Sequence, residues 1–199
     1  MNVAEAVLDF WFGSNADDAV VAADKSKLWF KKNQQVDDEI GKRFQNYADA
    51  AGRGELSHLT ASPRGRLAVI VLTDQFPRNI YRNTARAFAY DPIALSNCLA
   101  ALADGSDRRL RPIERAFCYM PLEHSESLKY QDQSVRLFTE LAQNAPDASE
   151  VTFQDFLNYA IRHREIIARF GRFPHRNQIL GRTSTPEEIE FLAHPGSKF

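Results

Sequence analysis

The sequence has only two cysteines among its 199 residues, and they do not form a C-x-x-C pair. A small disulfide-stabilised scaffold is therefore excluded. Cys98 and Cys118, both in apolar helical surroundings, are expected to be buried free thiols in a reducing compartment. The start of the chain lacks the basic and apolar regions of a signal peptide, and no apolar run approaches the length of a membrane span. We therefore expect a cytoplasmic protein without a membrane partner.

An excess of charge of one sign is also missing, because the formal net charge is −1 at pH 7. The chain as a whole therefore has no electrostatic attraction to nucleic acid, which is not expected as a partner. Lysine is scarce after Lys42, where only Lys129 and Lys198 follow, whereas residues 162–182 alone carry six arginines. Because the planar guanidinium of arginine suits paired or partly buried sites, these arginines are candidates for ion pairing or anion binding.

Alternating strand patterns and hairpin turns are absent, whereas helix signals recur along the chain. Ser62 and Asp91 each precede a proline at a first helical position, where they are predicted to cap a helix. Thr185 and Glu188 are typical of a capping box. Residues 67–72 are apolar on every side and would suit a strand by composition. The capping signal and the helical neighbours favour a buried central helix instead.

These patterns predict an all-α fold of eight to ten helices joined by short loops. Its length and its hydrophobic content of 44% suit a single all-helical domain over residues 1–199. No period near 34 residues recurs, so the letters alone do not demonstrate a repeat protein. The sequence does not define an oligomeric state, and a homo-oligomer is compatible with it.

Charged residues on apolar helix faces are the first sign of a site. In the predicted helix 152–171 the apolar stripe is continued by Arg164, and His163 lies at its margin. In the helix 63–76 the otherwise apolar face ends at Asp74. A carboxylate at a helix C-terminus faces an unfavourable dipole and needs cationic or hydrogen-bonding partners. Arg78 is a local candidate for this role, and Arg164 is a distant one.

The turn "YMPLEHSE", residues 119–126, is a second unusual place. Glu126 suits the first turn of the next helix, but Glu123 and His124 have no such routine role. Three interpretations apply to all these groups: structural ion pairs, a ligand pocket and a metal site. The letters "EHSE" lack the spacing of a helical HExxH metal site. No metal and no cofactor are therefore expected.

Two further stretches repeat one pattern, "DQFPRNIYR" at residues 74–82 and "RFGRFPHRNQILGR" at residues 169–182. Each contains an aromatic residue, a proline, a basic residue, an asparagine and a further arginine, and each follows a helix with a charged residue on its apolar side. We expect the two stretches to converge with residues 119–126 in one pocket. The candidate ligand-binding residues are Asp74, Arg78, Arg82, Glu123, His124, His163, Arg164, Arg172, His175, Arg176 and Asn177.

These motifs resemble the bacterial family catalogued as domain of unknown function 924. The resemblance is carried by "DQFPRNIYRNTARAF", "YMPLEHSE" and "HREIIARFGRFPHRNQILGR", in this order, and it spans almost the whole chain. It implies an all-helical fold related to tetratricopeptide repeats, in which antiparallel helix pairs are stacked in an array. It implies no reaction.

Three functions remain open at this stage. The first hypothesis is a binding protein whose arginine-lined pocket accepts an anionic small molecule or an acidic peptide. The second is an acid–base hydrolase or transferase acting on a phosphate- or carboxylate-bearing small molecule. It would use Glu123 or Asp74 as a base, and His124, His163 or His175 as an acid or base. The third is a scaffold in which every ion pair is structural. Three histidines around one open cavity, with a carboxylate in hydrogen-bond reach, would favour the enzyme.

Overall fold

The computed structural model describes residues 2–197, and the described chain is helical without strands. The fold is therefore all-α, as the sequence predicts. Short 3₁₀ turns lie at Ser57–Ala61, Ala85–Phe88, Ser106–Arg109, Asp147–Ser149 and Pro174–Arg176. The α-helices are α1 (Val3–Phe12), α2 (Asp18–Phe30), α3 (Gln34–Gly52), α4 (Pro63–Ile70), α5 (Phe76–Ile80), α6 (Asp91–Asp104), α7 (Pro112–Glu123), α8 (Leu128–Gln143), α9 (Glu150–Phe170) and α10 (Pro186–Leu192).

Two of the three predicted helix starts are confirmed. The side chain of Ser62 accepts a hydrogen bond from the backbone of Gly65 at 3.1 Å, and Thr185 and Glu188 form the reciprocal capping box. The prediction for Asp91 is wrong by one position. Asp91 is the first residue of α6, and its carboxylate accepts hydrogen bonds from Arg78 instead of capping the helix.

The helix predicted over residues 63–76 contains a π-helical turn at Val71–Gln75, which the sequence analysis did not anticipate. Its cause is Pro77, which has no backbone N–H to donate to Thr73 and whose ring would clash with that turn. The backbone N–H of Phe76 donates to the carbonyl of Val71, five residues back. All five residues of the turn are buried, including Asp74. Such turns are frequent at functional sites.

A hydrophobic core of residues from α1 to α9 holds these helices together. At its centre the rings of Trp11 and Phe117 meet edge to face, with centroids 5.7 Å apart. Cys98 and Cys118 are buried and free, as expected. The segment after α9 contributes to a second, smaller apolar cluster around Ile166, Ile167 and Phe173.

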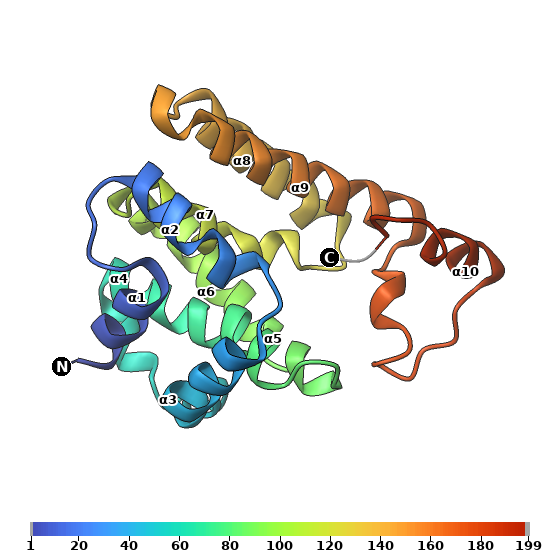
Figure 1. Cartoon of the computed structure of the whole chain (residues 1–199), viewed down its shortest axis with the longest axis horizontal. Helices are drawn as coiled ribbons and strands as arrows, with labels where there is room; N and C mark the ends of the chain where they lie inside the picture. The colour runs from blue at the N-terminus through green and yellow to red at the C-terminus, as the bar shows by residue number, and fades with distance from the viewer. Residues whose placement is uncertain (1, 198–199) are drawn as a thin grey trace.

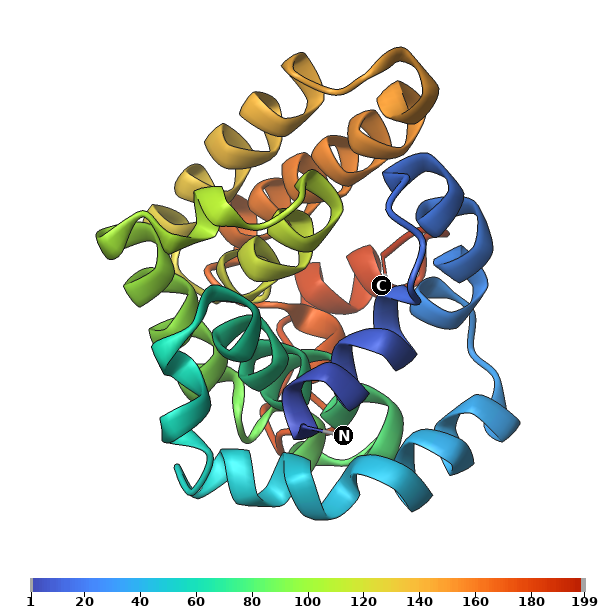
Figure 2. The ribbon, with the colours of Figure 1, turned by 90° about the vertical axis from the view of Figure 1, so that its left-hand side faces the viewer.

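The helices α8 and α9 pack side by side along one edge of the molecule, with α3 at the opposite edge (Figures 1 and 2). Because a short connection joins them, α8 and α9 are antiparallel. After α9 the chain turns away from this pair and leads to α10 at the end of the molecule (Figure 1). The stacked tetratricopeptide-like array remains a prediction. No helix within residues 2–197 has the length and apolar character needed to cross a membrane.

Candidate functional site

A cavity of about 710 Å³ lies where α2, α5, α7, α9 and the segment after α9 meet. This volume is in the range of small-molecule sites. Three of the predicted candidates, His124, His163 and His175, line it together. The polar and charged lining residues are Lys31, Lys32, Gln75, Arg78, Asn79, Arg82, Asn83, Glu123, His124, Tyr159, Arg162, His163, His175 and Arg176.

The buried carboxylate of Asp74 lies behind the residues that line the cavity, and it contacts three side chains. Its Oδ1 lies 2.7 Å from Nδ1 of His124 and 3.4 Å from a guanidinium nitrogen of Arg78. Its Oδ2 accepts a hydrogen bond from the amide of Gln75. Burial acts to raise the pKa of Asp74, but Arg78 and His124 outweigh it and lower the pKa to about 2. Asp74 is therefore an anion at neutral pH.

The ionised carboxylate of Asp74 determines which ring nitrogen of His124 carries the proton. An ionised carboxylate only accepts hydrogen bonds, so Nδ1 of His124 carries the proton of this contact. Burial and the charge of Arg78 lower the pKa of His124, against the opposing effect of Asp74. The imidazole is therefore neutral at pH 7 and has its lone pair on Nε2. His124 lines the cavity, so a bound molecule would meet a neutral imidazole there.

Glu123, which precedes His124 in the chain, is protonated and neutral at pH 7, in contrast to the ionised Asp74. Its side chain is buried, and burial and the nearby Asp74 raise its pKa to about 8, although Arg78 opposes the shift. Its Oε1 lies 3.1 Å from Nδ1 of His163, which also lies 2.8 Å from the carbonyl of Tyr159. Burial and His124 hold the pKa of His163 well below its usual value. The Glu123–His163 contact thus joins two neutral groups at pH 7 and is not an ion pair.

Two arginines form the cationic part of the wall. Arg78 donates to both oxygens of Asp91, at 3.0 and 3.1 Å. Arg176 donates to the carbonyl of His124 at 3.1 Å, and its guanidinium lies 4.6 Å from the ring centre of Phe88 and 4.4 Å from that of Phe173. Within the described residues, Nε of Arg176 has no hydrogen-bond partner although it is buried.

Arg176 is only 6% exposed, and burial together with the charge of Arg78 lowers its pKa to about 10. The nearest carboxylate oxygen, on Asp91, is 3.6 Å away and already serves Arg78. A buried cation beside a second cation, with an unused donor, is an incompletely satisfied arrangement. An anion in the cavity would offset the positive charge of the two arginines.

Arg82 lies at the rim of the cavity and is firmly paired. Its guanidinium donates to both oxygens of Asp37 at 2.7 Å, and the amide of Asn79 donates to the same carboxylate at 2.8 Å. His175 lines the cavity from the segment after α9. Burial and the charge of Arg176 lower its pKa to about 4. His175 is therefore neutral at pH 7.

Besides Asp74, which lies behind the cavity lining, three predicted candidates lie outside the cavity. The prediction for Arg164 is wrong, because its side chain is 41% exposed and its guanidinium pairs with Asp132 of α8 at 2.6 Å. His163 is the residue that continues the buried stripe of α9. Arg172 makes a bidentate pair with Glu188, and the buried Asn177 donates to Ser184 and to the same glutamate. These two residues fix the segment after α9 to α10.

Sequence reasoning missed Asp91 and Phe88, which flank the two arginines. Asp91 was assigned to helix capping, a role that its letter and its following proline suit equally well. Phe88 carries no signal by itself, since aromatic residues are most often part of a core. The cation–π position of Phe88 over Arg176 depends on residues 88 positions apart in the chain.

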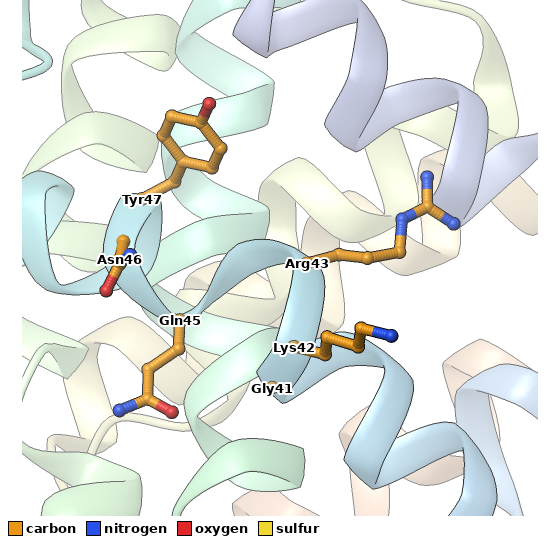
Figure 3. A pocket seen from close by; sticks show the side chains of 6 residues that line it. All are labelled: Gly41, Lys42, Arg43, Gln45, Asn46 and Tyr47. Carbon is orange, nitrogen blue, oxygen red and sulfur yellow. The ribbon is translucent and has the colours of Figure 1, made fainter.

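A second hollow lies along the exposed surface of α3 (Figure 3). Its wall is formed by one helix, and the labelled side chains of Lys42, Gln45 and Tyr47 point in different directions instead of toward a common point (Figure 3). Convergent polar groups, which a ligand site requires, are found in the larger cavity. In the part of the chain that the structure describes, no three His, Cys, Asp or Glu side chains are grouped so that they could hold a metal ion.

Two comparisons with known proteins found matches, and both matches are described as of unknown function. The model of the family described as "Bacterial protein of unknown function (DUF924)" matches residues 7–196. The solved structure of a protein of unknown function from Agrobacterium tumefaciens has 36% sequence identity and a TM-score of 0.74, over 88% of this chain and 98% of that chain. A comparison with curated proteins found no match. Neither description names a reaction, so the chemistry of the cavity rests on its own residues.

Proposed function

The chain belongs to the bacterial family of unknown function DUF924, and we propose that it binds the anionic group of a small molecule in the cavity and acts on that molecule by acid–base chemistry. The observation that carries the proposal is the contact of 2.7 Å between Asp74 and His124 at the wall of a cavity that Arg176 also lines. It places an oriented, neutral imidazole beside a buried arginine that lines the same cavity.

Anion binding is supported by the charges around the cavity. The basic lining residues are Lys31, Lys32, Arg78, Arg82, Arg162 and Arg176. The carboxylates of Asp37, Asp74 and Asp91 offset part of this charge from behind the wall. Glu123 is mostly protonated at pH 7 and adds little. The remaining positive charge favours a phosphate or carboxylate, to which an arginine can donate two hydrogen bonds.

Acid–base chemistry is supported by the neighbours Glu123 and His124. An imidazole whose Nδ1 is held by a buried carboxylate has Nε2 directed away from it as a proton acceptor, which is the arrangement of a general base. Glu123 keeps its proton at neutral pH and can act as the acid. Groups whose environments shift their pKa values in opposite senses are typical of acid–base pairs. A binding protein without chemistry would not require this arrangement.

The reaction class that suits these groups is hydrolysis or transfer. His124 would take a proton from water or from an acceptor hydroxyl, Glu123 would protonate the leaving group, and Arg176 would stabilise the anionic group. The cavity volume of about 710 Å³ suits a small molecule better than an acidic peptide. The assignment of His124 as the base lies within the roles that the sequence left open, whereas Glu123, expected there as a base, becomes the acid because burial raises its pKa to about 8.

Anion binding is tested by melting curves with phosphate, citrate and sulfate, against potassium chloride at equal ionic strength. A ligand at one hundred times its Kd adds about 2.7 kcal/mol to the free energy of unfolding, so the wild type should melt at a higher temperature. Arg176→Ala should abolish this response. Arg164→Leu is the matched control outside the cavity and should keep it. If no anion shifts the wild type, the binding proposal is wrong.

Catalysis is tested with aryl phosphates and aryl carboxylate esters as substrates. His124→Gln and Glu123→Gln should each lower kcat by roughly 10²–10⁴-fold, with a smaller change in KM. Arg164→Leu should leave both constants unchanged. Anion-induced stabilisation without turnover of any substrate would support binding and contradict the catalytic role.

A further inference from the structure

The helices α7 and α9 form the long walls of the cavity, and aromatic contacts show their register. The rings of Phe117 and Phe156 lie with centroids 6.3 Å apart, and those of His124 and His163 lie 6.2 Å apart. Each helix advances seven positions between these two contacts. The two helices therefore run in the same direction here, and the contacts are separated by about 10 Å along them, at about 1.5 Å per residue.

The first contact marks an apolar end of the cavity. Phe156 lines the cavity, and its ring centre lies 6.0 Å from that of Phe30, at the end of α2. Phe30 also lines the cavity and is 58% exposed, so its ring is accessible to a bound molecule. Trp29 and Met120 extend this apolar surface.

The second contact marks the polar end. Here His124 and Glu123 end α7, His163 lies one turn after Tyr159 on α9, and the segment after α9 adds Arg176. The polarity of the wall therefore changes along both helices in the same sense. A simple anion would occupy the polar end and leave the exposed ring of Phe30 and the surface around Phe156 in water.

Resting on the proposed function, we infer that the ligand is an amphipathic anion, in which a carboxylate or phosphate head is joined through a spacer to an aromatic ring. The head lies against Arg176 and His124, and the ring lies about 10 Å further along the helices, beside the contacting pair of Phe30 and Phe156. Aromatic rings prefer edge-to-face contacts at centroid separations of 4.5–7 Å, so one ring beside this pair can contact both phenylalanines. Burial of the ring is the source of affinity that distinguishes this ligand from inorganic anions.

The test compares Kd values, measured by titration calorimetry, for hexanoate, 6-phenylhexanoate and the neutral 6-phenylhexanol. We expect 6-phenylhexanoate, whose chain is long enough to reach from the polar end to the apolar end, to bind at least tenfold more tightly than hexanoate. 6-Phenylhexanol should bind at least tenfold more weakly than 6-phenylhexanoate. Phe30→Ala should reduce the gain from the ring to less than threefold, with little change for hexanoate. Tyr47→Ala, which removes an exposed ring from α3, is the control and should keep the gain.

The outcomes separate this inference from the proposed function. Equal affinities with and without the ring would overturn the inference and leave anion binding in place. A gain that survives in Phe30→Ala would overturn the placement of the ring. Equal binding of 6-phenylhexanol and 6-phenylhexanoate would overturn the anionic head, and with it the proposed function. If no compound binds, both proposals are wrong.

Discussion

Nδ1 of His124 lies 2.7 Å from Oδ1 of Asp74, although fifty positions separate the two residues in the chain. Asp74 reaches this place from a π-helical turn, and His124 reaches it from the residue that follows α7. Both residues were candidates in the sequence, but Arg78 and Arg164 were the expected partners of Asp74. The contact gives His124 its tautomer and Asp74 its low pKa, so the electrostatics of the cavity depend on it.

Removal of the charge of Asp74 should be costly. Loss of one partner from a buried charged cluster typically lowers the free energy of unfolding by about 3–5 kcal/mol, so Asp74→Asn should do so in a urea titration. Asp132→Asn removes the partner of Arg164 at an exposed pair and should cost less than about 1 kcal/mol. Equal losses in the two variants would show that Asp74 is not a member of a buried cluster.

The stability of the protein should fall on the alkaline side of a maximum near pH 6.5. The pKa of Glu123 is raised from 4.5 to about 8, so between these values the folded protein holds a proton that the unfolded chain releases. The free energy of unfolding therefore falls as pH rises through this window. Its slope is about 1.4 kcal/mol per pH unit, or roughly 2 kcal/mol between pH 6.5 and 8.

The histidines act in the opposite sense below pH 6.5. The pKa values of His124, His163 and His175 are all lowered in the folded protein, so only the unfolded chain binds these protons as the pH falls below about 6.5. Stability should therefore also decline toward acid pH. Urea titrations across pH 4–9 measure both limbs. Glu123→Gln should remove the alkaline decline, whereas Glu140→Gln, on the exposed face of α8, should retain it.

Two glycines of α3 should respond in opposite directions to alanine. A Cβ atom at Gly52 would lie 2.3 Å from the ring of Tyr90, whereas one at Gly41 would meet nothing within 4 Å. Gly52→Ala should therefore lower the free energy of unfolding by roughly 1–3 kcal/mol through overpacking. Gly41→Ala should raise it by roughly 0.5–1 kcal/mol, because alanine favours the helix. Thermal unfolding measures both effects, and a stabilised Gly52→Ala variant would contradict the packing of Tyr90.

The segment after α9 should loosen when Arg182 is removed. Arg182 donates to both oxygens of Glu126, at 2.6 and 2.9 Å, and to the carbonyl of Phe173. Few apolar contacts otherwise hold this segment, so Arg182→Ala should speed amide exchange over residues 171–185 and weaken the response to anions. Arg169→Ala removes an exposed pair with Glu187 and should leave the exchange of this segment unchanged. Unaltered exchange in Arg182→Ala would show that other contacts suffice.

The sequence predicted those structural features that depend on residues close together in the chain. Ser62 before a proline and the pair of Thr185 and Glu188 predicted helix starts, because a cap is formed within three residues of the chain. The apolar residues 67–72 were correctly assigned to a helix on the same grounds. The three motif stretches also indicated the family and the residues that converge on the cavity.

Tertiary packing decided which of these side chains face the cavity and which partners they have. His163 and Arg164 are adjacent in sequence, but successive positions of an α-helix differ by about 100° in direction, and α9 has apolar residues on both sides of the stripe. Only its packing against α7 and α8 places His163 inside and turns Arg164 toward Asp132. The partner of Asp74 is undetermined in the sequence for a related reason. A contact across fifty positions depends on how whole helices are placed, and burial, which shifts the pKa values of Glu123 and His124, exists only once they are packed.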